Sequence, residues 1–126
     1  MSQVPNDLRY TKTHEWMKAE GTTVTVGITD FAQKQLTDIV YIDLPKVGVS
    51  KKEGDVLLTV ESVKSAEDVF TPVSGEITAV NNSLSDNPEL INKDSYSNWI
   101  VKIKTAENIG SKGMSPDEYR KFIGEN

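Results

Sequence analysis

The segment Glu61-Ser62-Val63-Lys64-Ser65-Ala66 separates two apolar runs, 56–60 and 69–70, and predicts the turn of a β-hairpin. Acidic residues lie on both sides of the lysine. At a hairpin tip the Lys64 amine lies far from the backbone and can form one amide bond. It is therefore suited to carrying a covalently attached group on a rigid base. Most turn lysines are only solvated, so the rest of the sequence has to decide between the two interpretations.

The composition excludes several classes of site. The chain has 126 residues, enough for a domain with a real core, and a formal net charge of −5 at pH 7. Nucleic-acid binding is not expected, because neutralising phosphates requires clustered Lys and Arg. The absence of cysteine excludes disulfides, a thiolate metal site and a cysteine nucleophile, so any sulfur chemistry must come from an attached group. His14, the lone histidine, cannot build a histidine metal site alone.

The sequence shows no feature of membrane insertion or export. No apolar run approaches the length that spans a bilayer. Residues 1–7 lack both an apolar signal region and an Arg-rich amphipathic transit pattern. We therefore expect a cytoplasmic protein, most simply bacterial, or a mitochondrial matrix protein if the chain is a processed eukaryotic form.

Alternating apolar residues predict many short strands. The expected strands are 10–18, 24–28, 39–44, 56–61, 68–71, 77–80 and 99–104. Short strands at such close spacing favour a sandwich or a flattened barrel. Two of the expected buried faces consist of Val40, Ile42 and Leu44, and of Trp99, Val101 and Ile103.

Capping patterns predict three short helices, at 30–36, 87–92 and 115–123. The expected N-caps are Thr29 or Asp30 for the first helix, Asn87 for the second and Ser115, in a capping box, for the third. In the last helix Tyr119, Phe122 and Ile123 recur at helical spacing and predict a face that packs on the body of the protein.

Six segments carry a more specific signal when they are taken together. They are 10–16 (YTKTHEW), 26–33 (VGITDFAQ), 60–64 (VESVK), 71–77 (TPVSGEI), 81–92 and 99–104. In this order they resemble the glycine cleavage system H protein family, over about residues 8–124. The resemblance implies one lipoyl-binding domain over 1–126. Its expected fold is mainly β, a lipoyl-domain-like flattened barrel or sandwich of two antiparallel sheets with short peripheral helices and a C-terminal helix.

The resemblance also implies the site residues. Lipoate would be joined to Lys64 by an amide, giving N6-lipoyllysine, and this side chain with its lipoyl group is called the arm below. Thr13, Glu15 and Asp68 would dock the arm. There is an independent physical reason, since an aminomethyl group on sulfur carries a cationic amine that carboxylates can bind. No residue is expected to be catalytic or to bind a metal.

The function implied is that of a non-catalytic carrier. It would take the aminomethyl group of glycine from a decarboxylase that uses pyridoxal phosphate (PLP) to a tetrahydrofolate-dependent aminomethyltransferase. Dihydrolipoamide dehydrogenase, an FAD enzyme, would then reoxidise the arm. A lipoate ligase or lipoyl transferase would attach the cofactor. The carrier is expected to be a monomer that binds neither nucleic acid nor membrane.

Three other functions compete with that of a lipoyl carrier. Biotin carriers use a similar hairpin but typically place Met on both sides of the lysine, where this chain has Val63 and Ser65. A self-contained enzyme has little support, because His14 beside Glu15 is the only acid–base candidate and no nucleophile motif accompanies it. The third alternative, an H-like protein that acts in lipoate relay or scavenging, is not excluded by the sequence.

Overall fold

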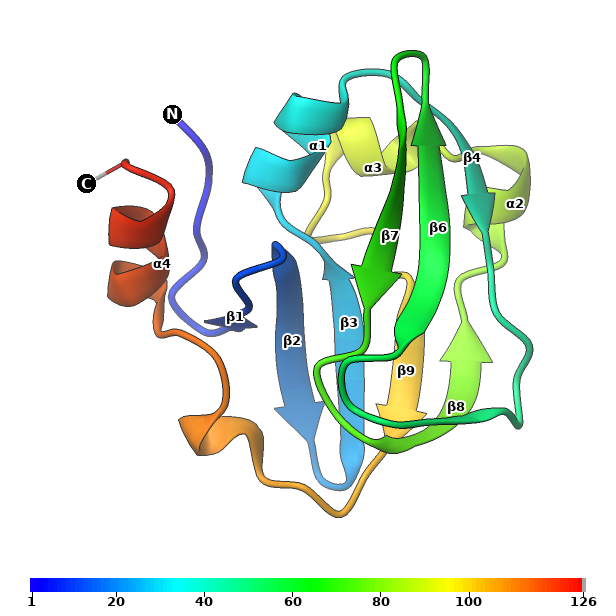
Figure 1. Cartoon of the computed structure of the whole chain (residues 1–126), viewed down its shortest axis with the longest axis vertical. Helices are drawn as coiled ribbons and strands as arrows, with labels where there is room; N and C mark the ends of the chain where they lie inside the picture. Colours follow the sequence, from blue (N-terminus) through cyan, green and yellow to red (C-terminus); the bar gives the residue numbers. More distant parts are fainter. Residues whose placement is uncertain (126) are drawn as a thin grey trace.

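Short alternating strands build two antiparallel sheets in the computed structural model, which describes residues 1–125 (Figure 1). The larger sheet has the order β1 (Arg9–Tyr10), β2 (Glu15–Glu20), β3 (Thr23–Ile28), β9 (Val101–Lys104), β8 (Gly75–Val80) and β5 (Ser50–Lys51). The smaller sheet has the order β4 (Ile39–Asp43), β6 (Val56–Ser62) and β7 (Ala66–Phe70). The helices are α1 (Asp30–Leu36), α2 (Ser83–Asp86), α3 (Leu90–Lys93) and α4 (Pro116–Phe122), with a 3₁₀ turn at Ile109–Ser111.

The main core lies between the two sheets. The larger sheet contributes Val26, Ile77 and Ile103, and the smaller sheet contributes Ile42, Val60 and Val69. Burying such side chains between facing sheets is the main favourable term in forming a sandwich. The prediction of a mainly β fold with two antiparallel sheets is confirmed, and within residues 1–125 the sheets do not close into a barrel.

The predicted first hairpin and first helix are both present. Strands β2 and β3 pair from Glu15↔Ile28 to Glu20↔Thr23, around a turn in which Gly21 adopts φ 62°. The chain then enters α1, where Thr29 is the N-cap and its hydroxyl accepts a hydrogen bond from the Ala32 N–H. The hairpin therefore leads directly into a helix that stands beside the lysine-bearing hairpin (Figure 1).

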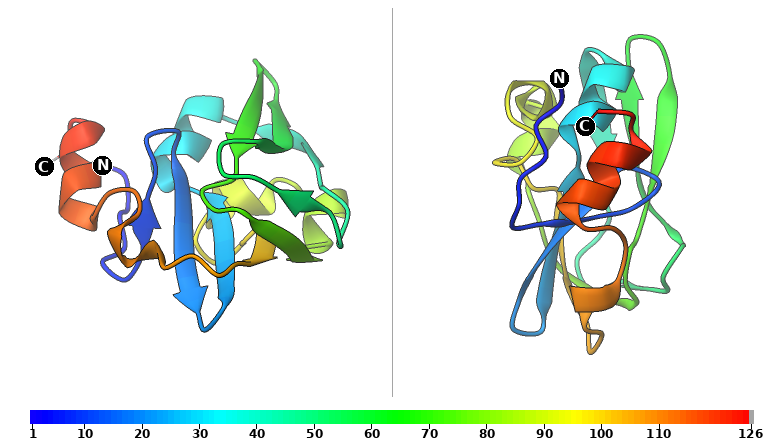
Figure 2. Two further views of the ribbon diagram at one scale, coloured as in Figure 1. Left: turned by 60° about the horizontal axis from the view of Figure 1, so that its bottom comes forward. Right: turned by 90° about the vertical axis from the view of Figure 1, so that its left-hand side faces the viewer.

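A second, smaller core joins the two ends of the chain. It consists of Val4, Leu8, Tyr10, Trp16 and Tyr119. The rings of Tyr10 and Tyr119 stack with centroids 4.7 Å apart, so α4 is fastened to the edge of the larger sheet. The predicted capping box of α4 is present, and Figure 2 shows the helix lying beside the N-terminal segment.

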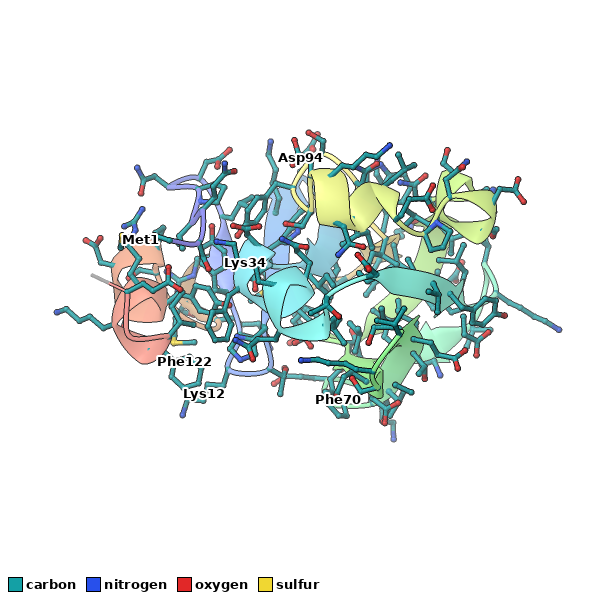
Figure 3. The ribbon with its side chains drawn as sticks, turned by 90° about the horizontal axis from the view of Figure 1, so that it is seen from above. Met1, Lys12, Lys34, Phe70, Asp94 and Phe122 are labelled. Atoms are coloured by element: carbon teal, nitrogen blue, oxygen red, sulfur yellow. The ribbon has the colours of Figure 1, made fainter. Side chains whose placement is uncertain are left out.

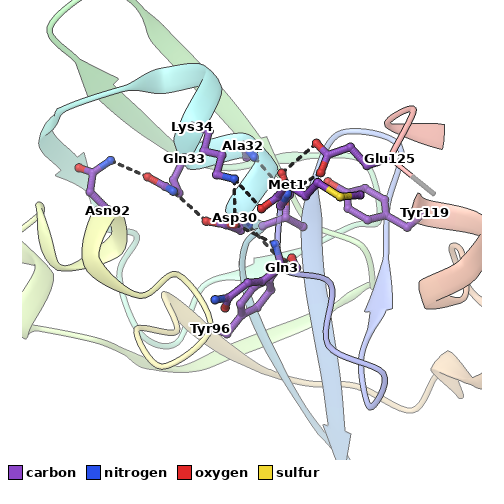
Figure 4. A network of polar contacts seen from close by, with 12 residues as sticks. Met1, Gln3, Asp30, Ala32, Gln33, Lys34, Asn92, Tyr96, Tyr119 and Glu125 are labelled. Carbon is purple, nitrogen blue, oxygen red and sulfur yellow. Dashed lines mark hydrogen bonds and ion pairs between the residues drawn. The ribbon is translucent and has the colours of Figure 1, made fainter. Parts of the chain in front are cut away.

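Polar contacts hold the N-terminal segment against α1 (Figure 4). The Gln3 N–H donates to Asp30 at 2.9 Å, and the Lys34 ammonium donates to the Met1 carbonyl at 2.9 Å. The Tyr96 hydroxyl donates to the Gln3 carbonyl at 2.6 Å. These contacts fix the N-terminal end of α1, which borders the site described below.

Two predicted apolar positions are more exposed than expected. Val40 is 54% exposed, because β4 has a register shift between Ile39 and Tyr41 that turns Val40 outward. Ile39 and Ile42 are the buried residues of that strand. Phe122 is 47% exposed, although its ring contacts that of His14 in the turn between β1 and β2. The prediction for Val40 was therefore wrong, and the one for Phe122 is met only in part.

Three predicted element boundaries are also corrected. The expected strand over 10–18 is broken by a turn at 11–14, so β1 and β2 are separate strands. The second helix begins at Leu90, and Asn87 ends the unpredicted α2. Before β9 the buried residue is Ile100, whose N–H donates to Val26, while Trp99 is only partly buried.

Candidate functional site

Lys64 lies at the tip of the hairpin formed by β6 and β7, which projects from one end of the molecule (Figure 1). The turn is closed by the Ser62 N–H, which donates to the Ser65 carbonyl at 2.7 Å. The Ser62 hydroxyl oxygen accepts from the N–H groups of Lys64 and Ser65, at 3.3 and 3.1 Å. The Val63 N–H donates to the Asp38 carbonyl at 3.0 Å, just before β4. An exposed amine therefore stands on a base that the backbone holds in place.

Lys64→Ala should leave the stability of the unmodified protein almost unchanged. The side chain is exposed, has no hydrogen-bond or ion-pair partner among residues 1–125, and stays out of both hydrophobic clusters there. Exposed substitutions of this kind usually change the free energy of unfolding by less than about 0.5 kcal/mol. Thermal melts of the mutant and the wild type should nearly coincide. A large drop in melting temperature would show that the lysine is structural.

A cleft of about 610 Å³ opens beside Lys64. Its walls come from the β6–β7 hairpin, from the turn between β1 and β2, and from α1. Figure 3 shows Lys12 of the turn and Phe70 of β7, which both line the cleft, on different elements seen from above. Apolar side chains, among them Val60 and Leu36, supply much of the lining. The cleft can therefore take a long, partly apolar group that is anchored at Lys64.

Asp68 gives the cleft part of its negative charge. It lies on β7 opposite Thr59 of β6, whose hydroxyl donates to Asp68 Oδ1 at 3.1 Å. The Asp68 side chain is exposed, and Glu67 beside it lines the same cleft. The second carboxylate oxygen of Asp68 has no partner among the described residues and is available to a cation.

Glu15 is different, because it is only 1% exposed. Its Oε1 accepts hydrogen bonds from the hydroxyls of Thr11 and Thr13, both at 2.5 Å, and its Oε2 accepts from the Phe70 N–H at 3.3 Å. Burial raises the pKa of Glu15, and the hydrogen bonds from Thr11, Thr13 and Phe70 work in the opposite direction. The carboxylate thus ties the β1–β2 turn to β7.

A second cleft, of about 570 Å³, continues from the first. Thr13 and Phe70 line both, whereas Glu15 lines only the second. In the second cleft, the Lys112 ammonium forms ion pairs with Glu53 and Glu107. The structure therefore brings Lys64, Thr13 and Asp68 around one cleft and places Glu15 just beyond Thr13.

Sequence reasoning missed two contributors to this region. The Thr11 hydroxyl donates to the same Glu15 oxygen as that of Thr13, and its only sequence signal is the Thr-Lys-Thr spacing. Tyr119 contacts the cleft residue His14 from 105 positions away, for which the local sequence holds no signal. Among residues 1–125 no group of three potential metal ligands is found, and no helix there is long and apolar enough to cross a membrane.

Comparison with known proteins agrees with this geometry. The family model described as glycine cleavage H-protein matches residues 8–126. A probable glycine cleavage system H protein of Picrophilus torridus is 59% identical over 125 residues, which cover 99% of this chain and 100% of that protein. One of Thermoplasma acidophilum is also 59% identical over 125 residues, with 98% of each chain covered.

A solved structure extends the comparison to the fold. The crystal structure of a glycine cleavage system H protein from Mycobacterium marinum superposes with a TM-score of 0.88 at 34% identity. The match covers 96% of this chain and 99% of that one. The chain therefore belongs to the glycine cleavage H-protein family, a family of non-catalytic carrier proteins.

Proposed function

We propose that this protein is the lipoyl carrier of a glycine cleavage system and that lipoate is attached to Lys64. The observation that carries the proposal is an exposed amine on a hydrogen-bonded turn, directly beside a cleft lined by apolar and acidic side chains. An amide-linked arm needs both features, a reachable amine and a surface to lie on. The membership of the chain in the glycine cleavage H-protein family supports the same assignment.

When attached, lipoate supplies the dithiolane sulfur chemistry that a chain without cysteine lacks. The protein's own contribution is position. Lys64 anchors the arm, and apolar residues such as Ala32, Leu36 and Phe70 offer it a surface that excludes water. Because the arm is tethered, its reactive end meets each docked partner at a high effective concentration.

Three side chains dock the loaded arm in this proposal. Asp68 offers a carboxylate in the first cleft to the cationic amine of the load. Thr13 lines both clefts and donates its hydroxyl hydrogen to Glu15. Glu15 acts from the second cleft. There it holds Thr13 and the Phe70 backbone in place, and its carboxylate adds negative charge next to the first cleft.

The partners in this proposal are the three enzymes of the system and the enzyme that attaches the cofactor. The arm receives the aminomethyl group at the PLP-dependent decarboxylase and delivers it at the tetrahydrofolate-dependent aminomethyltransferase. It is reoxidised at dihydrolipoamide dehydrogenase, which holds FAD. A lipoate ligase or lipoyl transferase modifies Lys64. The carrier works as a monomer in the cytoplasm.

The proposal is tested by following the mass of the intact protein. A lipoate ligase with lipoate and ATP should add one lipoyl group, and the modified protein should then gain an aminomethyl group when incubated with glycine and the decarboxylase. Unmodified protein under the same conditions is the control and should gain nothing. If the lipoylated protein stays unloaded with an active decarboxylase, the assignment to glycine cleavage fails, and a relay role becomes the better explanation.

A further inference from the structure

His14 lines the first cleft, the one beside Lys64, which is called the arm cleft from here on. Its backbone conformation there is unusual. Its φ is 71°, in the left-handed region that non-glycine residues seldom adopt. The imidazole lies between Phe31 of α1 and Phe122 of α4, with ring centroids 4.9 and 5.8 Å away. The ring is therefore held by two helices, although the residue itself belongs to the β1–β2 turn.

The hydroxyl of Tyr119 determines how this ring is held. It lies 2.8 Å from His14 Nδ1 and 2.7 Å from the Thr29 hydroxyl, and both Tyr119 and Thr29 are fully buried. Thr29 Oγ1 already accepts from the Ala32 N–H as the cap of α1, and its own hydrogen has no acceptor other than the Tyr119 oxygen among the described residues. A buried hydroxyl hydrogen needs an acceptor, so Thr29 donates to Tyr119.

The direction of this pair fixes the proton on His14. Because the Tyr119 oxygen accepts from Thr29, its hydrogen is directed to His14 Nδ1, which must be unprotonated to accept it. The neutral ring then carries its hydrogen on Nε2. Burial lowers the pKa of His14, which favours the neutral ring, and burial raises the pKa of Tyr119, which keeps its hydroxyl protonated.

We propose that Tyr119 is a positioning residue for the arm cleft, and that it holds His14 as the neutral Nε2–H tautomer in the cleft wall. The inference rests on the proposed function for the identity of the arm. In this state the wall offers a hydrogen-bond donor without a positive charge. Glu67 and Asp68 of the same cleft are then left to pair with the cationic end of a loaded arm, for which an imidazolium would compete.

The other charged groups of the cleft agree with this role. Lys12 precedes His14 by two residues, and Lys64, Glu67 and Asp68 belong to the hairpin. Amide formation at Lys64 would remove one of the two lysine charges. Among these cleft residues, His14 is thus the one whose Nδ1 protonation is set by a hydroxyl on α4.

Tyr10 provides a matched control for a merely structural role. It lies in the same small core, is as completely buried as Tyr119, and stacks on it. Its hydroxyl, however, donates to the Pro5 carbonyl at 2.6 Å and does not contact His14. Tyr119→Phe and Tyr10→Phe therefore each remove one buried hydroxyl from one cluster, and only the first removes the partner of His14.

The first measurement uses the unmodified full chain. His14 is the only histidine, so its two ring nitrogens give unambiguous ¹⁵N signals. In the wild type and in Tyr10→Phe, Nδ1 should resonate as an unprotonated nitrogen and Nε2 as a protonated one. In Tyr119→Phe the two signals should move together toward the values of a tautomer mixture. Unchanged nitrogen shifts in Tyr119→Phe would overturn the assignment, whatever lipoate does.

The second measurement uses the lipoylated, loaded protein. Loss of the one neutral hydrogen bond that positions His14 should speed the release of the aminomethyl group, as ammonia and formaldehyde, about fivefold in Tyr119→Phe. Tyr10→Phe should release at the wild-type rate. Equal acceleration in both variants would show a general loss of packing and overturn the positioning role. A protein that takes no lipoate at Lys64 would instead refute the proposed function while the nitrogen shifts still report on Tyr119.

Discussion

Replacing Lys64 by arginine is expected to abolish lipoylation completely. Arginine keeps the positive charge and the length of the side chain, but its guanidinium does not form the amide that the lysine amine forms. Peptide mapping after treatment with a lipoate ligase should find the adduct on Lys64 in the wild type and no adduct in Lys64→Arg. Loading with glycine and the decarboxylase should disappear in the same variant, because the acceptor sulfur is missing.

Lys52→Arg is the matched control for this experiment. Lys52 is also exposed, but it lies between β5 and β6, before the start of the strand whose other end leads into the Lys64 turn. The Lys52→Arg variant should be lipoylated at Lys64 like the wild type. Each amide removes one positive charge, so the net charge should move from −5 to −6 in the control and stay at −5 in Lys64→Arg. An adduct on another lysine, with Lys64 bare, would refute the assignment of the attachment site.

Neutralising the docking carboxylates should make the loaded protein lose its aminomethyl group about ten- to a hundredfold faster. A hydrogen bond to a charged group contributes roughly 1.5–3 kcal/mol, which corresponds to that change in the ratio of docked to free arm. Asp68→Asn keeps an acceptor for the Thr59 hydroxyl and removes the charge. Glu15→Gln is preferred to alanine, because alanine would leave the hydroxyls of Thr11 and Thr13 without their acceptor. The measurement is ammonia or formaldehyde release from purified loaded protein over time.

Asp43→Asn separates a local effect from a general loss of negative charge. Asp43 is an exposed carboxylate of the same sheet and lies opposite Thr59 on the other side from Asp68, but it lines neither cleft. Its variant should release at the wild-type rate. If Asp68→Asn and Glu15→Gln also release at that rate, these carboxylates do not protect the arm, and the attachment at Lys64 stands without them.

The sequence by itself determined the features that depend on neighbours along the chain. The Lys64 turn follows from two apolar runs around a short polar segment, and the caps at Thr29 and Ser115 follow from side chains that reach backbone N–H groups a few residues away. The fold class follows from the number and spacing of the strands. The six motifs resemble those of the glycine cleavage system H protein family in the same order, and this resemblance indicated the family.

Local patterns failed where a tertiary contact outweighs periodicity. Val40 obeys the alternation of a strand, but the irregular pairing of β4 with β6 turns it to solvent. Asn87 and Pro88 form a good helix start, yet the helix begins later because Asn87 already ends α2. The partner that turns Val40 outward lies on another strand, whereas Asn87 is taken up by the helix just before it, where its N–H donates to the Ser83 carbonyl.

Only the tertiary structure decided which residues share the site. Glu15 appears in the sequence as one of many acids. Its buried carboxylate is satisfied by hydroxyl donors in the β1–β2 turn and by a backbone donor 55 residues away on β7. His14 owes its orientation to Tyr119, 105 residues later, whose helix packs there because Tyr10 stacks on its ring. Hydrogen bonds and ring contacts act over a few ångströms in space, whereas sequence periodicity reports only the direction in which a side chain leaves its own element. The sequence therefore sufficed to propose Lys64 as the attachment point, whereas the cleft that we propose for the arm required the fold.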